Sequence, residues 1–471
     1  MQFSEQPGTG ARQAVQGLRT VPFWLDSPDR PTPQPPLSGV DEADLVIVGG
    51  GFTGLWTALL AKQADPERRV VLLEGGRIAE GATGRNGGFV SASLTHGLAN
   101  GAARFGDELP TLLRLGRENF EAIEQTVREF GIECDFRRAG ELDVAVTEHQ
   151  ASDLRDLARL GQEYGEDLEW LDQDATRALV DSPTYVAGLL DRSGVALVDP
   201  ARLAWGLAAA MRSAGVVVHE GTPVTALQEA GARVRVMTPA GSVVAPRVAL
   251  ATNAYPPLLS RLRHYIVPVY DYVLVTEPLS AEQWGSIGWS GREGLSDAGN
   301  RFHYYRVTPD GRILWGGYDA VHHFGSRFER RWETDSTHLA RIAEHFHQTF
   351  PSLRDLRFTH GWGGVIDTCS RFSAFWGTAL SGKVGYVLGF TGLGVGASRF
   401  GALTMLDLLE GRETERTRLR MVRTKPLPFP PEPLRSMGIS ITTRSLTRAD
   451  VTGRRDLWLR TLDRLGMGFD S

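Results

Sequence analysis

Apolar runs that end in glycines mark both ends of the central part of the chain. Leu45–Val48 and Val384–Leu388 are uninterrupted apolar segments, and each is followed by a glycine cluster and then by a helical pattern. Arg69–Leu73 is a further strand of the same kind. Continuous apolar runs are typical of parallel strands that are buried on both faces. The pattern therefore predicts a strand, a glycine turn and a helix at each end of the core.

The chain between these two ends contains both helical and strand-like patterns of apolar residues. Apolar residues spaced three or four apart predict helices over 52–63, 108–130, 151–164, 203–214, 336–350 and 397–410. Alternating or short apolar runs predict strands over 141–146, 216–219, 224–227, 233–238, 242–246 and 247–251, and a β-rich stretch over 266–318. The polar, proline-rich residues 1–40 predict an extended surface arm, and the basic C-terminal stretch predicts one helix over 454–465. We therefore predict an α/β fold, α+β overall, in which a Rossmann-like domain of discontinuous segments receives an inserted antiparallel-sheet domain.

Composition narrows the class of protein. Hydrophobic residues make up 42% and charged residues 23% of the chain, which indicates a folded globular protein. The net charge of -5 argues against binding of nucleic acid through phosphate neutralisation. Cys134 and Cys369 cannot form a disulfide framework or a zinc site, and adjacent or alternate histidines do not face one side as metal ligands should. We expect free thiols, no metal, no secretory signal, no membrane span and a cytoplasmic location.

A G-x-G-x-x-G motif carries the most specific chemistry. Gly49, Gly51 and Gly54 follow a predicted buried strand and open a helix, and the next strand ends at Glu74. In this context the glycines make the tight turn, admit the pyrophosphate and allow helix–strand packing. The helix N-terminus attracts the phosphates, and the acid accepts hydrogen bonds from the ribose. The motif predicts a bound dinucleotide; the alternative is a glycine-rich turn without a ligand.

Two further glycine-rich segments indicate which dinucleotide is bound. Residues 75–89 form a long loop that includes Thr83 and Arg85, where a nicotinamide dehydrogenase would normally enter a helix. Such a loop suits a backbone that runs beside a flavin, although a mobile surface loop has the same composition. Residues 389–396 lead directly into a helix whose N-terminus would stabilise negative charge on the flavin pyrimidine. Both segments favour FAD.

The chain resembles the FAD-dependent oxidoreductases of the D-amino-acid oxidase (glycine oxidase) superfamily, most closely the γ-glutamylputrescine oxidase branch. The resemblance covers about residues 44–411 and rests on separated motifs in the family's order, at 46–55, 81–88, 134–143, 198–203, 221–224, 251–255, 266–270, 362–364 and 389–395. It implies non-covalent FAD, a substrate domain whose antiparallel sheet covers the flavin, and hydride transfer from a C–N carbon to flavin N5. The resulting imine is hydrolysed.

The resemblance also implies domain boundaries and site residues. The FAD-binding domain is expected over 44–100, 190–260 and 355–411, the substrate domain over 101–189 and 261–354, an N-terminal arm over 1–43 and a C-terminal tail over 412–471. The expected FAD contacts are Gly49, Gly51, Phe52, Thr53, Gly54, Glu74, Thr83, Arg85, Asn86, Gly87, Gly88, Val224, Ala251, Thr252, Gly364, Gly392, Leu393, Gly394 and Val395. Strands carrying Tyr270, Tyr272, Tyr304 and Tyr305 are expected to roof the substrate pocket. Its proposed catalytic residues are Tyr270, Arg306 and Trp362.

Departures from the family pattern indicate which class of substrate to expect. Ile366 stands where amino-acid oxidases often place an arginine that clamps the substrate carboxylate, and Asp367 follows it. Ile366 also occupies the place of the cysteine that binds flavin covalently in some members. The strand over 311–315 lacks the lysine that activates oxygen in others, so the acceptor is O2 or another oxidant. We expect an amine oxidase; the alternatives are a deaminating amino-acid or aminophosphonate oxidase and a non-catalytic flavin-binding protein.

Overall fold

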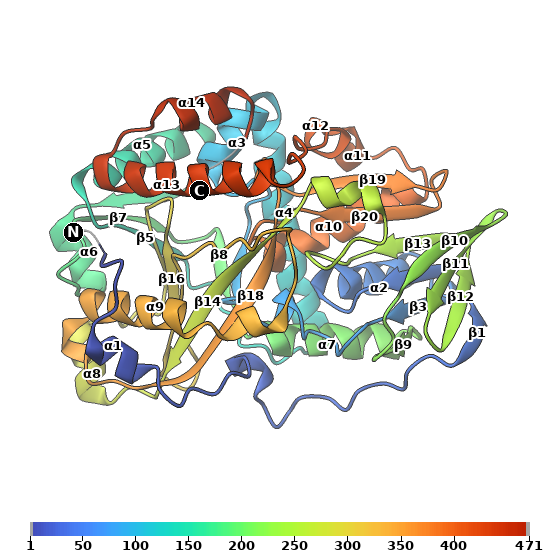
Figure 1. The fold of residues 1–471 in the computed structure, drawn as a ribbon, viewed down its shortest axis with the longest axis horizontal. Helices are drawn as coiled ribbons and strands as arrows, with labels where there is room; N and C mark the ends of the chain where they lie inside the picture. The colour runs from blue at the N-terminus through green and yellow to red at the C-terminus, as the bar shows by residue number, and fades with distance from the viewer. Residues whose placement is uncertain (1–2, 468–471) are drawn as a thin grey trace.

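Two large sheets organise the computed structural model, which describes residues 3–467 (Figure 1). The six-stranded sheet has the order β19-β20-β13-β2-β3-β9, and every pair in it is parallel except β19 with β20. Its strands are β2 (Leu45–Val48), β3 (Val70–Leu73), β9 (Val217–His219), β13 (Arg247–Leu250), β19 (Phe375–Ala379) and β20 (Val384–Leu388). Segments that lie far apart in the chain therefore build one mainly parallel sheet, as predicted.

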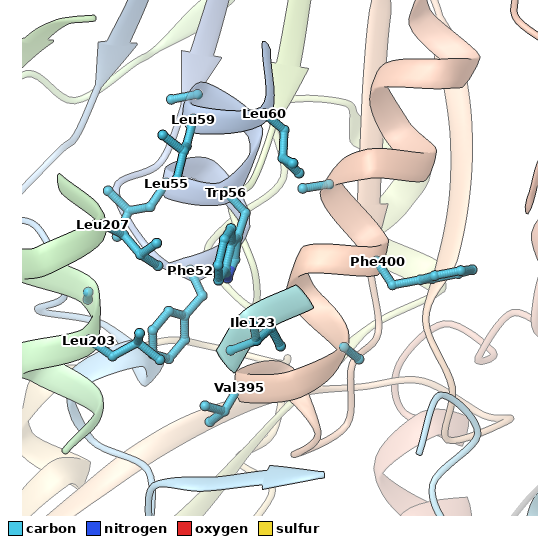
Figure 2. Close-up of a cluster of buried hydrophobic side chains, with 14 of the residues drawn as sticks. Phe52, Leu55, Trp56, Leu59, Leu60, Ile123, Leu203, Leu207, Val395 and Phe400 are labelled. Atoms are coloured by element: carbon cyan, nitrogen blue, oxygen red, sulfur yellow. The ribbon is translucent and has the colours of Figure 1, made fainter. Parts of the chain in front are cut away.

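Apolar helices cover this sheet because its central strands are buried along their whole length. Helix α2 (Phe52–Ala64) contacts both α7 (Pro200–Ser213) and α10 (Gly394–Leu409). Figure 2 shows Leu55 of α2 near Leu207 of α7, while Trp56 lies on the side of α10. Burying a leucine side chain stabilises the fold by roughly 1.5–3 kcal/mol, so this cluster holds α2 between α7 and α10.

The N-terminal arm is more ordered than an extended surface segment. Its strand β1 (Gly39–Glu42) pairs in parallel with β12 (Gly241–Ala245) in a four-stranded sheet of order β1-β12-β11-β10. The other strands there are β10 (Ala226–Ala230) and β11 (Arg233–Thr238). Helix α1 (Thr9–Ala14) contacts α9 (Ser336–Thr349), and Trp24 is buried. Strand pairing by β1, the contact of α1 with α9 and the burial of Trp24 thus attach the arm to both halves of the molecule (Figure 1).

The second large sheet has eight strands in the order β18-β14-β17-β16-β15-β5-β7-β6. They are β5 (Glu141–Ala145), β6 (Leu168–Leu171), β7 (Ala187–Asp191), β14 (Val267–Thr276), β15 (Gly294–Asp297), β16 (His303–Val307), β17 (Ile313–Gly317) and β18 (Phe358–Thr368). Strand β18 pairs with β14 along its length, although its residues were expected to belong to the FAD-binding domain. Helix α9 covers one face of this sheet. A small sheet joins β4 (Phe89–Ser91) to β8 (Val195–Leu197).

The remaining helices pack on both halves of the molecule. They are α3 (Leu98–Phe105), α4 (Leu109–Glu129), α5 (Glu148–Tyr164), α6 (Gln173–Leu179), α8 (Ala281–Ile287), α11 (Glu415–Arg418), α12 (Arg420–Arg423), α13 (Leu434–Thr452) and α14 (Leu457–Arg464). Helices α4 and α11 contact α10, α12 contacts β19, and α5 and α6 contact the eight-stranded sheet. Helix α13 was not predicted; it lies beside α5 and α14 along the top of Figure 1. Asp450 fixes it by accepting hydrogen bonds from Asn300 and from the main chain of Arg301. Among residues 3–467, none of the helices is long and apolar enough to cross a membrane.

Candidate functional site

A cavity of about 1960 Å³ lies between the two large sheets and beneath α13. Every expected FAD contact lines it except Gly54 and Gly88. The lining also includes the cavity-facing residues of the eight-stranded sheet and apolar residues of α13. The structure therefore brings the separated glycine-rich segments of the sequence into one site.

The first glycine turn fits a dinucleotide. Gly49 has a φ of 112°, and a Cβ there would lie 2.4 Å from the main-chain oxygen of Ala251. A Cβ on Gly54 would lie 1.9 Å from the oxygen of Gly49, so this glycine permits the close helix–strand packing that we predicted. The carboxylate of Glu74 accepts hydrogen bonds from the amides of Gly50 at 2.6 Å and Gly76 at 2.7 Å. The acid is thus held at the turn, and burial raises its pKa.

The loop over 75–89 is held firmly in place. The Asn86 side chain donates to the oxygen of Thr83 at 2.8 Å and accepts from the amide of Gly88 at 2.8 Å. Trp362 donates from its indole to the oxygen of Arg85 at 3.0 Å. Arg85 itself forms an ion pair with Glu333 at 3.1 Å. These contacts favour a fixed cofactor-binding loop over the alternative of a mobile surface loop.

The second glycine cluster is anchored by a buried carboxylate. Asp367 accepts a hydrogen bond from the amide of Gly389 at 2.6 Å, and burial raises the pKa of this acid to about 6. The carboxylate of Asp367 therefore points toward the loop that carries Gly389. Helix α10 then begins at Gly394 without a side-chain cap, so its first amides can donate to a ligand. This arrangement fits a flavin ring beside the helix N-terminus.

None of the three proposed catalytic residues lines the cavity. Arg306 is 1% exposed, and its guanidinium donates to the main-chain oxygens of Val198 at 2.6 Å and Gly88 at 3.3 Å. Burial lowers the pKa of Arg306 to about 10. Tyr270 lies on the opposite face of its strand and donates to the oxygen of Glu329 at 3.2 Å. Arg306 and Trp362 thus support the flavin loop from behind, and Tyr270 packs away from the site.

The sheet instead presents Tyr304 and Asp271 to the cavity. The Tyr304 hydroxyl donates to the Asp271 carboxylate at 2.6 Å, and burial raises the pKa of Asp271 to about 6. Tyr304 was expected among the tyrosines of the roof, whereas Asp271 was not predicted. Strand alternation could have separated Tyr304 from Tyr305, because neighbouring residues face opposite sides. Tyr304 and Tyr305 are both largely enclosed, however. The sequence of this strand therefore has no polar face that would indicate which side lines the cavity.

Further along the cavity wall, the single Ser296 hydroxyl lies within hydrogen-bonding distance of two carboxyl groups, that of Glu141 at 3.0 Å and that of Asp143. Burial raises the pKa of Glu141 to about 8 and that of Asp143 to about 6. Neither acid forms an ion pair with another residue in the part of the chain that the structure describes. This part of the wall is therefore rich in acidic groups, although arginines such as Arg117 and Arg301 line other parts of the same cavity.

Comparisons with known proteins agree with this site. The family model for FAD dependent oxidoreductase matches residues 44–408. The chain is 32% identical over 403 residues to gamma-glutamylputrescine oxidoreductase of Escherichia coli, covering 83% of this chain and 89% of that protein. It is 28% identical to a probable oxidoreductase, OrdL, of Haemophilus influenzae, covering 79% and 84%. The crystal structure of glycine oxidase from Geobacillus kaustophilus superimposes with a TM-score of 0.67 at 21% identity, covering 82% of this chain and 99% of that one.

Proposed function

Because the chain belongs to the family of FAD-dependent oxidoreductases, we propose that it oxidises the C–N bond of an amine to an imine, which water then hydrolyses. The protein is an enzyme, and FAD is its cofactor. When bound, the flavin supplies the two-electron acceptor, while the protein supplies placement and electrostatics. Relatives of this chain are named for γ-glutamylputrescine, sarcosine and glycine, so the family covers both amines and amino acids.

The residues of the cavity can hold FAD along its whole length. Gly51 and the N-terminus of α2 suit the pyrophosphate, and Glu74 suits the ribose hydroxyls. The loop carrying Asn86 and the N-terminus of α10 suit the ring. We further propose that FAD is bound non-covalently, because Ile366 offers no nucleophile. The two buried free thiols support a cytoplasmic location.

The acidity of the cavity wall supports an amine over an α-amino acid. Asp271 and the Glu141–Asp143 pair face the cavity, while Ile366 and Gly364 occupy the side where amino-acid oxidases often carry an arginine that clamps the substrate carboxylate. Arg85 is paired with Glu333, and Arg306 is turned toward the main chain. An α-carboxylate placed beside Asp271 and Ile366 would lie near a like charge and would lack a bidentate partner at that point. A cationic amine at the same place would instead lie near a carboxylate of opposite charge.

Anaerobic bleaching of the flavin tests this proposal with matched pairs. Putrescine is compared with ornithine, and n-butylamine with norvaline, so that each pair differs only by an α-carboxylate. We expect the amine of a pair to reduce the flavin faster. A consistent advantage of the carboxylated member would establish the amino-acid oxidase alternative instead. Bleaching by no amine, amino acid or aminophosphonate would favour the non-catalytic alternative, and mixing the reduced enzyme with O2 or an artificial dye identifies the class of acceptor.

A further inference from the structure

Two separate contacts bring Asp271 to the loop that suits the flavin ring. On β18, Gly364 lies directly opposite Asp271 on the same face of the sheet, and a Cβ on this glycine would lie 3.4 Å from the Cβ of Arg85. On β16, the ring of Tyr304 lies so close to Gly87 that a Cβ added to this glycine would lie 2.8 Å from the ring. The two routes, through different strands, place the carboxylate at the wall beside the reacting end of the proposed cofactor.

The Asp271 carboxylate has hydrogen-bond donors but no cation. It accepts hydrogen bonds from the Tyr304 hydroxyl and, at 2.8 Å, from the main-chain amide of Tyr272. Across residues 3–467, no lysine, arginine or histidine forms an ion pair with Asp271. A carboxylate in an enclosed wall without a counter-cation is costly, and a bound ammonium group removes part of that cost.

The surrounding charged groups are engaged elsewhere. On the segment after β17, Asp319 pairs with Arg341 at 2.7 Å and with His338. On the flavin loop, Arg85 pairs with Glu333. On β18, Asp367 is directed toward Gly389. Asp271 is therefore the carboxylate at this position that remains available to a ligand.

We propose that Asp271 takes the proton from the substrate's ammonium nitrogen, with Tyr304 as the positioning residue that sets the charge state of this acid. The inference rests on the proposed amine oxidation. An N–H bond of the ammonium breaks and an O–H bond forms on Asp271, which leaves a neutral amine with a free lone pair. The C–H hydrogen then leaves with its electron pair, the C–N bond becomes C=N, and FAD is the acceptor of both electrons. A protonated amine has no lone pair with which to form that double bond.

The test measures anaerobic flavin reduction by putrescine between pH 5 and 10 in the holoenzyme. In the wild-type enzyme we expect the second-order rate constant to rise with pH as Asp271 ionises near pH 6. Asp271→Asn should lose this dependence and react about 100-fold more slowly at pH 8. Asp271→Glu should recover part of the rate. The matched control is Asp310→Asn, which removes an exposed carboxylate from the β16–β17 turn and should leave the profile unchanged.

Tyr304→Phe separates positioning from mere support of the fold. Its hydroxyl holds the pKa of Asp271 down, so its loss should move the acidic limb of the profile to higher pH. Infrared difference spectra of flavin-loaded and flavin-free protein provide a readout independent of turnover. A protonated-carboxyl band should titrate in the wild type, disappear in Asp271→Asn and titrate at higher pH in Tyr304→Phe.

Two results would overturn the inference. The first is an Asp271→Asn enzyme that reduces within threefold of wild type with the same pH profile. The second is an infrared band that is unaffected by Asp271→Asn. Either result leaves the proposed function intact, provided that amines still bleach the flavin. Failure of every amine to bleach the wild-type flavin would instead overturn the proposed function, and the infrared titration would still report on Asp271.

Discussion

Trp24 in the N-terminal arm donates a hydrogen bond from its indole to the main-chain oxygen of Asn86 at 2.9 Å. The arm thereby stabilises the loop proposed to lie beside the flavin. Trp24→Phe keeps most of the packing but removes this bond, which contributes about 1 kcal/mol. We expect FAD to bind about fivefold more weakly, as measured by recovery of flavin fluorescence on dilution. Trp284→Phe, on α8, is the control, and equal affinities in the two variants would exclude this role of the arm.

Gly51→Val should abolish retention of FAD. A Cβ at this position would lie 2.9 Å from the Thr83 hydroxyl, which accepts a hydrogen bond from the amide of Phe52. The branched side chain would also enter the space proposed for the pyrophosphate. We expect less than about one-tenth of the wild-type flavin per polypeptide after purification, judged by the visible-to-ultraviolet absorbance ratio. Gly285→Ala, where a Cβ meets nothing within 4 Å, should keep its flavin.

Arg306→Lys should reduce stability and leave substrate binding unchanged. Lysine retains the charge but cannot reproduce the guanidinium bonds to Val198 and Gly88. The free energy of unfolding in urea should fall by roughly 1–3 kcal/mol. The dissociation constant of putrescine in anaerobic titrations should stay within twofold. A large increase in that constant with no loss of stability would restore Arg306 as a substrate-binding residue.

The acidic wall predicts a pH dependence of stability. Burial raises the folded-state pKa of Glu141 from 4.5 to about 8, so the folded state binds more protons than the unfolded state between these values. This contribution is fully present below pH 4.5 and is lost as the pH rises toward 8. Glu141→Gln should therefore flatten the decline and stabilise the protein by roughly 1 kcal/mol or more at pH 8. Thermal melting of the wild type and of Glu141→Gln at pH 5 and pH 8 measures this difference in stability. A variant that is less stable than the wild type at pH 8 would contradict the expectation.

Denaturation should release FAD. Ile366 lies on the cavity wall in place of the cysteine that binds flavin in some members of the family, and its side chain cannot form a covalent bond to the cofactor. After precipitation with acid, we expect flavin absorbance in the supernatant and none in the protein pellet. Flavin fluorescence that migrates with the polypeptide on a denaturing gel would show a covalent bond at another residue.

The sequence was sufficient for the nucleotide-binding half and insufficient for the tail. Leu45–Val48 and Val384–Leu388 were predicted with their observed bounds, because an uninterrupted apolar run before glycines has few other structural interpretations. Helix α13 was missed because the residues that it buries include Arg435, Thr442 and Ser445. Its apolar residues are largely exposed or line the cavity, so the sequence shows no apolar stripe facing the core.

The functional site, like the fold, was predictable from the sequence only in part. The FAD contacts follow from spacing along the chain, since Gly49, Gly51 and Gly54 act within one turn. The substrate side depends on which strands become neighbours. Only the pairing of β14 with β18 places Asp271 opposite Gly364, and local sequence does not encode that register. Tyr270 was therefore chosen for the site although it faces α9's side of the sheet.

The cavity is lined by residues from Val48 to Met467, nearly the whole length of the chain. During synthesis on the ribosome, the first glycine turn emerges long before the second cluster over 389–396, and α13 and α14 emerge after both. A nascent chain therefore carries only part of the flavin-binding surface while elongation continues. We expect cofactor uptake to follow release of the finished polypeptide, so that flavin scarcity leaves complete, empty enzyme in the cell instead of stalled translation products.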